Sequence, residues 1–309
     1  RRQRQMCIRD RPTISQFLEN NGQDIRTLYH SNNCWTSLKR AAGRIAYKDD
    51  VITKRLEKGM ANLLHHNTAS FLHFIELFID GSKQYLDTKN YKYALMLYYA
   101  LFQDRLDKTG FASIYEALEL IHKGMYSYFR QEISEIISYL LAHLQLKTMP
   151  LGEDVLPGLE LYGCYTREEI FTLVGRQTEA RKMQGSVTGV FNLSEHNATL
   201  LFVTLNKSDK DFSPSTQYND YLINEHYFHW QSQNTDSHQN NGGQRYTKQA
   251  DTQNKIILFV REEKKDGYGN TCPFHCFGLV EYMSSHDDFP MNITWKLQQP
   301  AMAQYVKAI

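Results

Sequence analysis

The chain lacks the features that mark membrane-spanning and disulfide-stabilised proteins. It contains no run of about 18 apolar residues, the length that a membrane-crossing helix needs. Its five cysteines are scattered over 309 residues, which argues against a disulfide framework. We expect no signal peptide, since residues 1–11 lack the apolar stretch of one. We therefore expect the reducing cytoplasm as its compartment and no membrane partner.

Signatures of the common catalytic sites are also missing. No G-x-x-x-x-G-K-[ST] P-loop, H-E-x-x-H zinc motif or G-x-S-x-G nucleophile elbow occurs. The nearest metal candidate, Cys272-Pro-Phe-His275-Cys276, has no second ligand pair, and zinc needs four ligands. We expect no catalytic residue, no metal and no cofactor. By itself the chain should neither hydrolyse ATP nor cut DNA.

The first stretch, RRQRQMCIRDR (1–11), holds five Arg against one Asp. A basic arm favours phosphate contacts, and transit peptides are Arg-rich, but Pro12 ends the stretch at once. The codons CGT CGG CAG CGT CAG ATG TGT ATA AGA GAC of a transposase mosaic-end sequencing adapter encode residues 1–10. We interpret residues 1–11 as translated adapter, and expect the gene to extend upstream.

The remaining chain has the composition of a globular protein, with 41% hydrophobic and 22% charged residues. Its charge is uneven. Residues 12–150 carry 16 basic and 14 acidic side chains, whereas residues 151–309 carry 14 basic and 19 acidic ones. An acidic second half argues against generic coating of nucleic acid, although it leaves room for a local pocket.

Hydrophobic periodicity predicts helix after helix in residues 12–150. Thr13 to Gln16 has the pattern of a capping box, which marks a helix start. YKYALMLYYALF (91–102) is apolar nearly all round and predicts a buried helix. We interpret these stripes as the core of a helical domain.

The periodicity changes after Pro150. Residues 149–163 hold two Pro and three Gly, which is typical of a domain boundary. Strand-like runs follow at 189–193, 199–205, 227–232, 255–262, 274–283 and 292–297. The expected fold class is α+β. A helical domain (12–150) precedes a mostly β domain (151–309) that closes as a small barrel or sandwich.

The strongest local signal lies between residues 219 and 246. In a strand here, Trp230 faces one way and His229, Gln231 and Gln233 face the other. An imidazole and two amides on one face are unusual in a core, because each buried polar group needs a partner. The same groups suit the reading of base edges. The alternative is that the amides face solvent and the loop after them is merely long.

We assign nucleic-acid binding to residues that can stack on a base, read its edge or contact phosphate. Trp230, Tyr218 and Tyr246 are the candidate stackers, and Asp220 can accept from a cytosine N4 amino group. The full candidate set is Lys207, Lys210, Tyr218, Asp220, His229, Trp230, Gln231, Gln233, Asn234, Arg245 and Tyr246.

Several motifs follow one another in a familiar order. They are LYGCYTREEI (161–170), FHWQSQNT (228–235), GQRY (243–246), ILFVREEKKDGYGNTCPFHCFGLVEYMS (257–284) and MNITWKL (291–297). Together they resemble a C-terminal domain of unknown function in bacterial superfamily 2 (DEAD/DEAH-type) helicase-like proteins. RPTISQFLENNGQDIRTLY (11–29) is similar to the helical part that precedes that domain.

The resemblance implies more than the residues themselves show. Full-length relatives commonly carry a phospholipase D-like nuclease and an ATPase upstream, and some resemble restriction enzymes that attack DNA containing 5-methylcytosine. It implies an SRA- or PUA-like barrel that recognises double-stranded DNA, by extrusion of a modified cytosine. The partners would then be DNA and the upstream helicase and nuclease domains. Residues 177–191 depart from the pattern, which weakens the expectation of a pocket element there.

Two other functions remain open. The domain can dock onto the helicase and regulate its ATPase, or it can be an RNA-binding PUA-like module. A concave pocket containing Trp230 and Gln231 would favour a reader of bases, and a flat apolar patch would favour docking.

Overall fold

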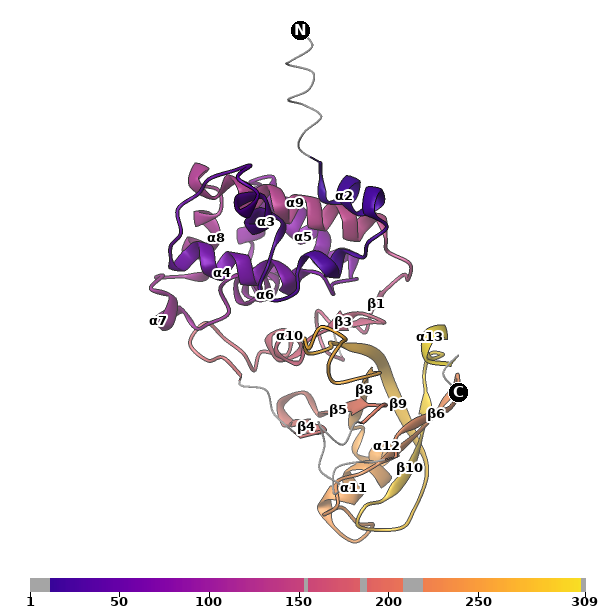
Figure 1. Ribbon diagram of the computed structural model, residues 1–309. Coiled ribbons are helices and arrows are strands. Elements are labelled where there is room, and N and C mark those ends of the chain that lie inside the picture. The colour runs from indigo at the N-terminus through magenta and orange to yellow at the C-terminus, as the bar shows by residue number, and fades with distance from the viewer. Residues whose placement is uncertain (1–11, 153–154, 184–187, 208–218, 307–309) are drawn as a thin grey trace. The chain divides into compact units, whose positions relative to one another are not determined.

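A computed structural model describes residues 12–152, 155–183, 188–207 and 219–306 (Figure 1). The chain divides into two units. One comprises the residues up to Leu146 together with Phe171–Met183, and the other comprises Lys147–Ile170 together with Gln184–Ile309. Phe171–Met183 thus belongs to the helical unit, although it lies beyond the boundary expected near residue 150. The adapter-like residues 1–11 lie outside the described residues.

The first unit is built from helices joined by short turns (Figure 1). Its α-helices are α2 (Ile14–Asn21), α3 (Trp35–Ala41), α4 (Val51–Gly59), α5 (Ala69–Ile79), α6 (Tyr91–Phe102), α7 (Leu106–Thr109), α8 (Ile114–Leu120) and α9 (Ser127–Ala142). Short 3-10 segments are η1 (Ile25–Leu28), η2 (Met60–Leu63), η3 (Lys83–Leu86), η4 (Thr88–Asn90) and η5 (Gly124–Tyr126).

Local sequence signals explain where several of these helices begin. The capping box predicted at Thr13 and Gln16 is present, and each side chain bonds the backbone of the other residue. Helix α3 is capped from a distance. The buried Glu132 carboxylate of α9 accepts the backbone N–H groups of Trp35 and Thr36, at 2.7 and 2.8 Å. Burial raises the pKa of Glu132, and the two backbone N–H groups oppose that rise.

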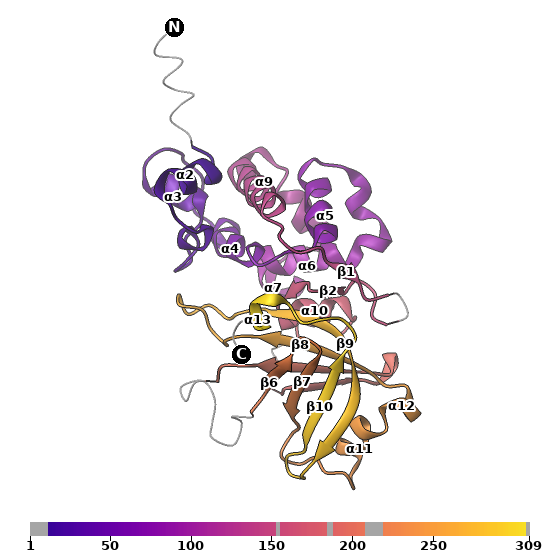
Figure 2. The same ribbon diagram turned by 90° about the vertical axis from the view of Figure 1, so that its right-hand side faces the viewer.

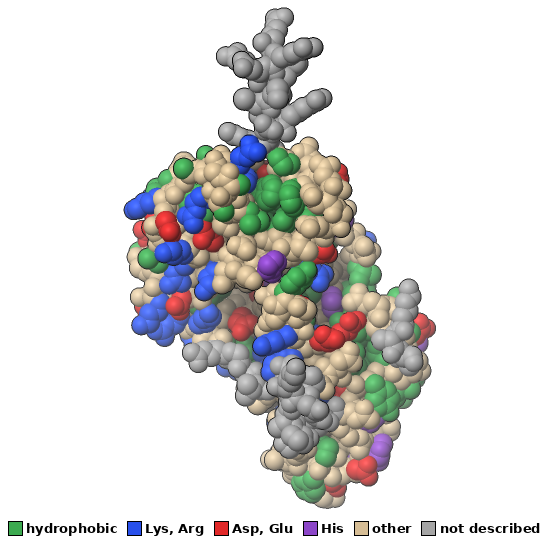
Figure 3. All heavy atoms as spheres, in the orientation of Figure 1, with side chains coloured by type: hydrophobic (Ala, Val, Ile, Leu, Met, Phe, Trp, Pro, Cys, Tyr) green, Lys and Arg blue, Asp and Glu red, His purple; other side chains and the backbone are tan. Residues whose placement is uncertain are grey.

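Helix α6 forms the centre of the helical unit. Its residues from Ala94 to Phe102 are all buried, as the all-round apolar pattern predicts. Helix α4 approaches it closely at Gly59, where an added Cβ would lie 2.7 Å from the Leu101 Cα. Figure 3 shows a group of Lys and Arg side chains on this unit, with some acidic side chains among them. They lie on the side where Figure 1 shows α4. No helix in the described ranges has the length and apolar composition that crossing a membrane requires.

The second unit is mostly β. Its strands are β1 (Met149–Pro150), β2 (Glu160–Leu161), β3 (Cys164–Tyr165), β4 (Val190–Leu193), β5 (Ala198–Thr204), β6 (Tyr221–Asn224), β7 (Tyr227–Gln231), β8 (Lys255–Arg261), β9 (Phe274–His286) and β10 (Asn292–Leu297). Short helical segments are η6 (Ser194–His196), α11 (Asn241–Thr247), α12 (Gln249–Thr252) and α13 (Ala303–Val306), and α10 (Arg167–Leu173) begins in this unit and ends in the helical one.

The larger sheet is mixed and open. Its strands follow the order β4-β5-β8-β9-β10-β7-β6, with β3 paired to β9 (Figure 2). Strands β5 and β8 are parallel, and the other pairs are antiparallel. The fold is therefore α+β as expected, but the expected closed barrel is wrong for the described residues, because β4 and β6 remain separate edges. All six strand-like runs of the sequence form strands, whereas β6 and the short β1 to β3 were not predicted.

Large aromatic side chains fill the core beneath this sheet. Trp230 of β7 and Trp295 of β10 lie with their ring centroids 6.2 Å apart. Tyr246 of α11 meets Trp230 edge to face, at 5.1 Å between centroids. Trp230 is 4% exposed, and Trp295 and Tyr246 are fully buried. Edge-to-face contacts of this kind add to the stabilisation that burial already provides.

We predict that Trp230→Ala lowers the free energy of unfolding by about 3–5 kcal/mol, because it leaves a cavity among rings that cannot fully close it. Urea denaturation measures the change. Tyr268→Ala is the control, since Tyr268 is 51% exposed and its loss should cost less than about 0.5 kcal/mol. A Trp230→Ala protein as stable as the parent would show that this ring is not part of the core.

Candidate functional site

The candidate site is the polar face of three neighbouring strands, β6, β7 and β10. Strand pairing sets Tyr221 of β6 opposite His229 of β7, and His229 opposite Thr294 of β10. In the adjacent row, Gln231 of β7 lies opposite Asn292 of β10. Because side chains alternate along a strand, these residues share the face opposite the tryptophan core.

An aromatic platform lies at the edge of this face. The Tyr221 ring stacks on the His229 imidazole, with 4.6 Å between ring centroids and 13° between planes. Tyr221 is 42% exposed, whereas His229 is 9% exposed. The His229 Nδ1 lies 2.8 Å from the Asn219 carbonyl oxygen. Since a carbonyl only accepts, Nδ1 carries the proton and the ring is held in one orientation.

A chain of side-chain amides continues from this platform. The Gln231 Oε1 accepts the Asn219 backbone N–H at 2.7 Å, and its Nε2 donates to the Asn292 Oδ1 at 3.0 Å. The Asn292 Nδ2 donates in turn to the Asp287 Oδ2 at 2.9 Å. These bonds set which end of each amide is donor and which is acceptor, so the row presents a defined hydrogen-bonding pattern.

A buried ion pair supports the site from β6. The Lys207 Nζ lies 2.6 Å from the Asp220 Oδ2, and the two side chains are only 8% and 3% exposed. The other oxygen of Asp220 accepts the Gln231 backbone N–H at 2.9 Å. Burial raises the pKa of Asp220, and the Lys207 charge opposes that rise. The pair thus ties the chain at Lys207 and before β6 to strand β7.

The structure separates the predicted site residues into groups. His229 and Gln231 lie together on the polar face, with Asp220 bound to Lys207 beside them. Trp230 and Tyr246, proposed as base stackers, lie in the hydrophobic core instead, where their rings pack on each other. Trp230 and Gln231 project from opposite faces of β7, so they cannot line one pocket.

The other predicted residues lie at the margins of this face. Strand β7 ends at Gln231, so Gln233 and Asn234 belong to the turn that follows and not to the strand alternation. Arg245 lies in α11, where its charge lowers the pKa of Asp236 against the rise that burial causes. Tyr218 and Lys210 lie outside the described residues.

A second hydrogen-bonded chain connects the loops beyond the site. The His238 Nδ1 lies 2.8 Å from the Asp288 Oδ1, and its Nε2 lies 2.7 Å from the Ser285 Oγ. The His238 backbone N–H also donates to Asp288, and these two bonds lower the pKa of the Asp288 carboxyl. The order of groups is that of a hydrolase triad. The Phe289 N–H also donates to the Asp236 carbonyl, which joins the same two segments of the protein. We therefore assign the hydrogen-bonded row of Asp288, His238 and Ser285 a structural role.

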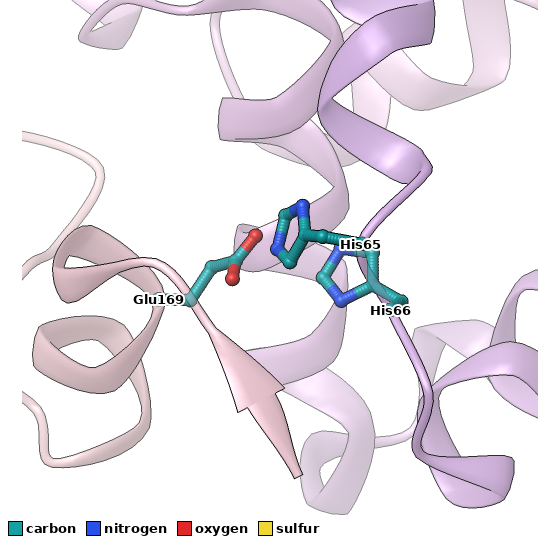
Figure 4. A group of neighbouring side chains, drawn as sticks. All are labelled: His65, His66 and Glu169. Atoms are coloured by element: carbon teal, nitrogen blue, oxygen red, sulfur yellow. The ribbon is translucent and has the colours of Figure 1, made fainter. Parts of the chain in front are cut away.

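The metal candidates of the sequence are packed into the fold. Burial raises the pKa of Cys276 to about 12, and the His275 Nδ1 lies 2.7 Å from the Tyr305 hydroxyl. In the helical unit, the rings of His65 and His66 pack with centroids 4.2 Å apart (Figure 4). Glu169, also labelled there, belongs to the other unit, where it accepts the Thr166 N–H at 2.8 Å at the start of α10.

Within either unit taken alone, the described residues bring no three His, Cys, Asp or Glu side chains within reach of one metal ion.

Tyr221, Asn292 and Thr294 are site residues that the sequence did not indicate. Tyr221 directly follows the candidate Asp220, and Asn292 opens a strand-like run. Neither signal shows that they face His229 and Gln231, because that depends on strand pairing. Tyr221 pairs within the β6–β7 hairpin, whereas Asn292 pairs with a strand about 60 residues earlier in the chain.

The fold and site together define a mixed-sheet domain with one polar, aromatic-edged face. Residues 159–308 match the family model described as a domain of unknown function (DUF3427). The match begins at the short β2 strand and includes every residue of the candidate site that lies in a described strand. No curated protein matches the chain.

We predict that Lys207→Met destabilises the protein, by about 3–5 kcal/mol at pH 8, because it leaves the buried Asp220 carboxylate without its cation. Removal of the cation raises the pKa of Asp220 further. For an acid whose pKa is higher in the folded than in the unfolded protein, stability falls as pH rises from about 4, the unfolded value, through the folded value. The loss should therefore be smaller at pH 5 than at pH 8, as measured by urea denaturation.

The double variant Lys207→Met/Asp220→Asn is the matched control. It removes the charge as well as the cation, so it should recover stability and lose the added pH dependence. An equal loss at both pH values in the single variant would contradict the assignment of Asp220 as the uncompensated charge.

Proposed function

We propose that the polar face of β6, β7 and β10 binds nucleic acid and receives an unstacked base on the Tyr221 ring. The observation that carries the proposal is the stacked pair of Tyr221 and His229 at the edge of the sheet, with a partly exposed ring on the outside. Proteins that bind unpaired bases commonly stack them on aromatic side chains that project from a sheet.

Hydrogen-bonding groups beside the platform support the same function. Gln231 and Asn292 offer amide groups in fixed orientation, and His229 uses Nδ1 for the fold. Among the described residues none bonds to the His229 Nε2, which can therefore contact the edge of a bound base. Both oxygens of Asp220 are held by Lys207 and the Gln231 N–H, whereas the amide nitrogens of Gln231 and Asn292 each have a second hydrogen, so edge reading falls to the amides.

The charge of the domain favours recognition over general affinity. Residues 151–309 hold 14 basic and 19 acidic side chains, so counterion release contributes little to binding by this part. Stacking is worth about 1–3 kcal/mol per base and is possible with every base, because each base has a π-face. The proposed interaction is thus selective for an accessible base.

The target follows from the motif resemblance described under the sequence. That resemblance is to a C-terminal domain of helicase-like proteins, and it implies relatives that resemble modification-dependent restriction enzymes with a target-recognising C-terminal region. This implication favours double-stranded DNA with an extruded 5-methylcytosine as the proposed ligand. Extrusion costs a few kcal/mol, which stacking and edge contacts must offset. The helicase and nuclease domains that such enzymes carry upstream are the proposed partners.

Docking onto an ATPase is the second candidate function. Ile223 of β6 and Met283 of β9 are 43% and 48% exposed, and apolar side chains on a sheet surface fit a protein partner. RNA binding by the same aromatic face is the third. One set of binding measurements distinguishes these functions.

We predict that Tyr221→Ala weakens binding of the whole chain to a duplex with 5-methylcytosine by about 1–3 kcal/mol, or roughly 5- to 150-fold, through loss of the stacking surface. Tyr221→Phe should bind as the parent does. Fluorescence anisotropy at one stated salt concentration, with matched methylated DNA, unmethylated DNA and RNA, measures the effect.

Tyr268→Ala is the matched control, because it removes an exposed tyrosine of the same unit from a loop outside this face. If Tyr221→Ala and Tyr268→Ala both bind as the parent does, nucleic-acid recognition by this face is wrong and docking becomes the leading function. A preference for RNA over both duplexes would favour the third function.

A further inference from the structure

The helical unit carries a basic hollow of about 580 Å³ along α4. Val51, Lys54, Arg55 and Lys58 line it from α4, and Asn62 continues the line in η2. Residues three and four apart lie on one face of a helix, so these side chains form one stripe. The opposite stripe of α4, which includes Leu56, is buried in the core.

The lining of the hollow has a positive charge. It contains three cations, Lys54, Arg55 and Lys58, and one carboxylate, Asp104. Lys54 lies 3.5 Å from Asp49, but the two side chains are 67% and 55% exposed, and pairs this exposed contribute little. Within the described ranges, no carboxylate forms an ion pair with Lys58.

The walls of the hollow are braced by bonds to the end of α6. The Arg55 guanidinium donates to the Phe102 carbonyl at 2.5 Å, which uses one of its five donors. The Asn62 Nδ2 donates to the Ala100 carbonyl at 2.9 Å, and the Gln103 Nε2 donates to the Leu101 carbonyl at 2.6 Å. These side chains cover the negative end of α6 and hold the hollow open between the two helices.

We propose that this hollow binds the phosphate backbone of a nucleic-acid strand. Lys54 and Lys58 line the hollow one helical turn apart on α4, and Arg55 lies between them in sequence. A long polyanion can contact all three at once, whereas the concave shape does not match a flat membrane surface.

The role differs from that of the candidate base platform. Phosphate contacts position a strand and set its affinity, but they carry no sequence information. The hollow therefore supplies general, salt-dependent affinity, which the acidic second half of the chain lacks.

The test is binding of the whole chain to unmethylated duplex and single-stranded DNA across a series of NaCl concentrations. Lys54→Ala/Lys58→Ala should weaken binding to every sequence alike. It should also reduce the slope of log affinity against log salt by roughly two on duplex DNA, because each phosphate contact contributes about 0.9. Thermal melting checks that the variant remains folded.

Lys89→Ala/Lys123→Ala is the matched control, since it removes two exposed lysines of the same unit that do not line the hollow. It should leave the slope unchanged. Equal slopes for the two double variants, or no binding by the parent in 50 mM NaCl, would overturn the proposal. Displacement of DNA by polyglutamate would also overturn the proposal, if the protein's affinity for polyglutamate is lost in Lys54→Ala/Lys58→Ala.

Inorganic phosphate and a mononucleotide serve as competitors that separate the sources of phosphate. An unlabelled oligonucleotide that displaces the DNA sets the reference concentration of phosphate groups. Neither competitor should displace DNA at that phosphate concentration, because a single phosphate cannot contact the whole stripe. Displacement of DNA by either competitor at that concentration would indicate a site for a small phosphate ligand and would overturn the proposal. Tyr221→Ala should not alter the salt slope, so this result is separate from the test of the base platform.

Discussion

The mutual packing of Trp230, Tyr246 and Trp295 determines which face of β7 meets the core. Side chains alternate strictly along a strand, so a buried Trp230 forces His229 and Gln231 to the other face. A shift of one residue would move the imidazole and an amide into the apolar core and move the indole out of it, and both changes are costly. The arrangement of the candidate site therefore depends on a contact in the core, on the far side of the sheet.

Two buried or partly buried polar groups complete the outer face. The Lys207–Asp220 pair holds the chain before β6 to the backbone of β7, and Gln231 bonds both Asn219 and Asn292. Each partner is satisfied, so the outer face is ordered before any ligand arrives. Such order reduces the entropy lost on binding, which is why a platform built on strands is more favourable than one built on loops.

Much of the fold could be predicted because its signals are local. Thr13 and Gln16 mark a helix start within four residues, and all six strand-like runs form strands. The open edges of the sheet and the parallel pairing of β5 with β8 were not predictable, because they depend on contacts between distant segments. For the site, strand alternation placed His229 and Gln231 together, but composition alone suggested Trp230 and Tyr246 as stackers. Their place in the core is decided by three-dimensional packing.

The proposed surfaces divide binding between the two units in complementary ways. The hollow along α4 offers charge without sequence information, and the face of β6, β7 and β10 offers stacking and oriented amides with little net charge. A protein with both can hold a strand by its backbone and select it by a base, whatever the arrangement of the units.

Photo-crosslinking of the whole chain to a duplex that carries one 5-iodocytosine, followed by mass spectrometry, examines whether a base reaches the Tyr221 platform. We predict that the crosslinked base is attached to Tyr221 or His229. Attachment only to residues outside β6, β7 and β10 would contradict a base-binding role for this face.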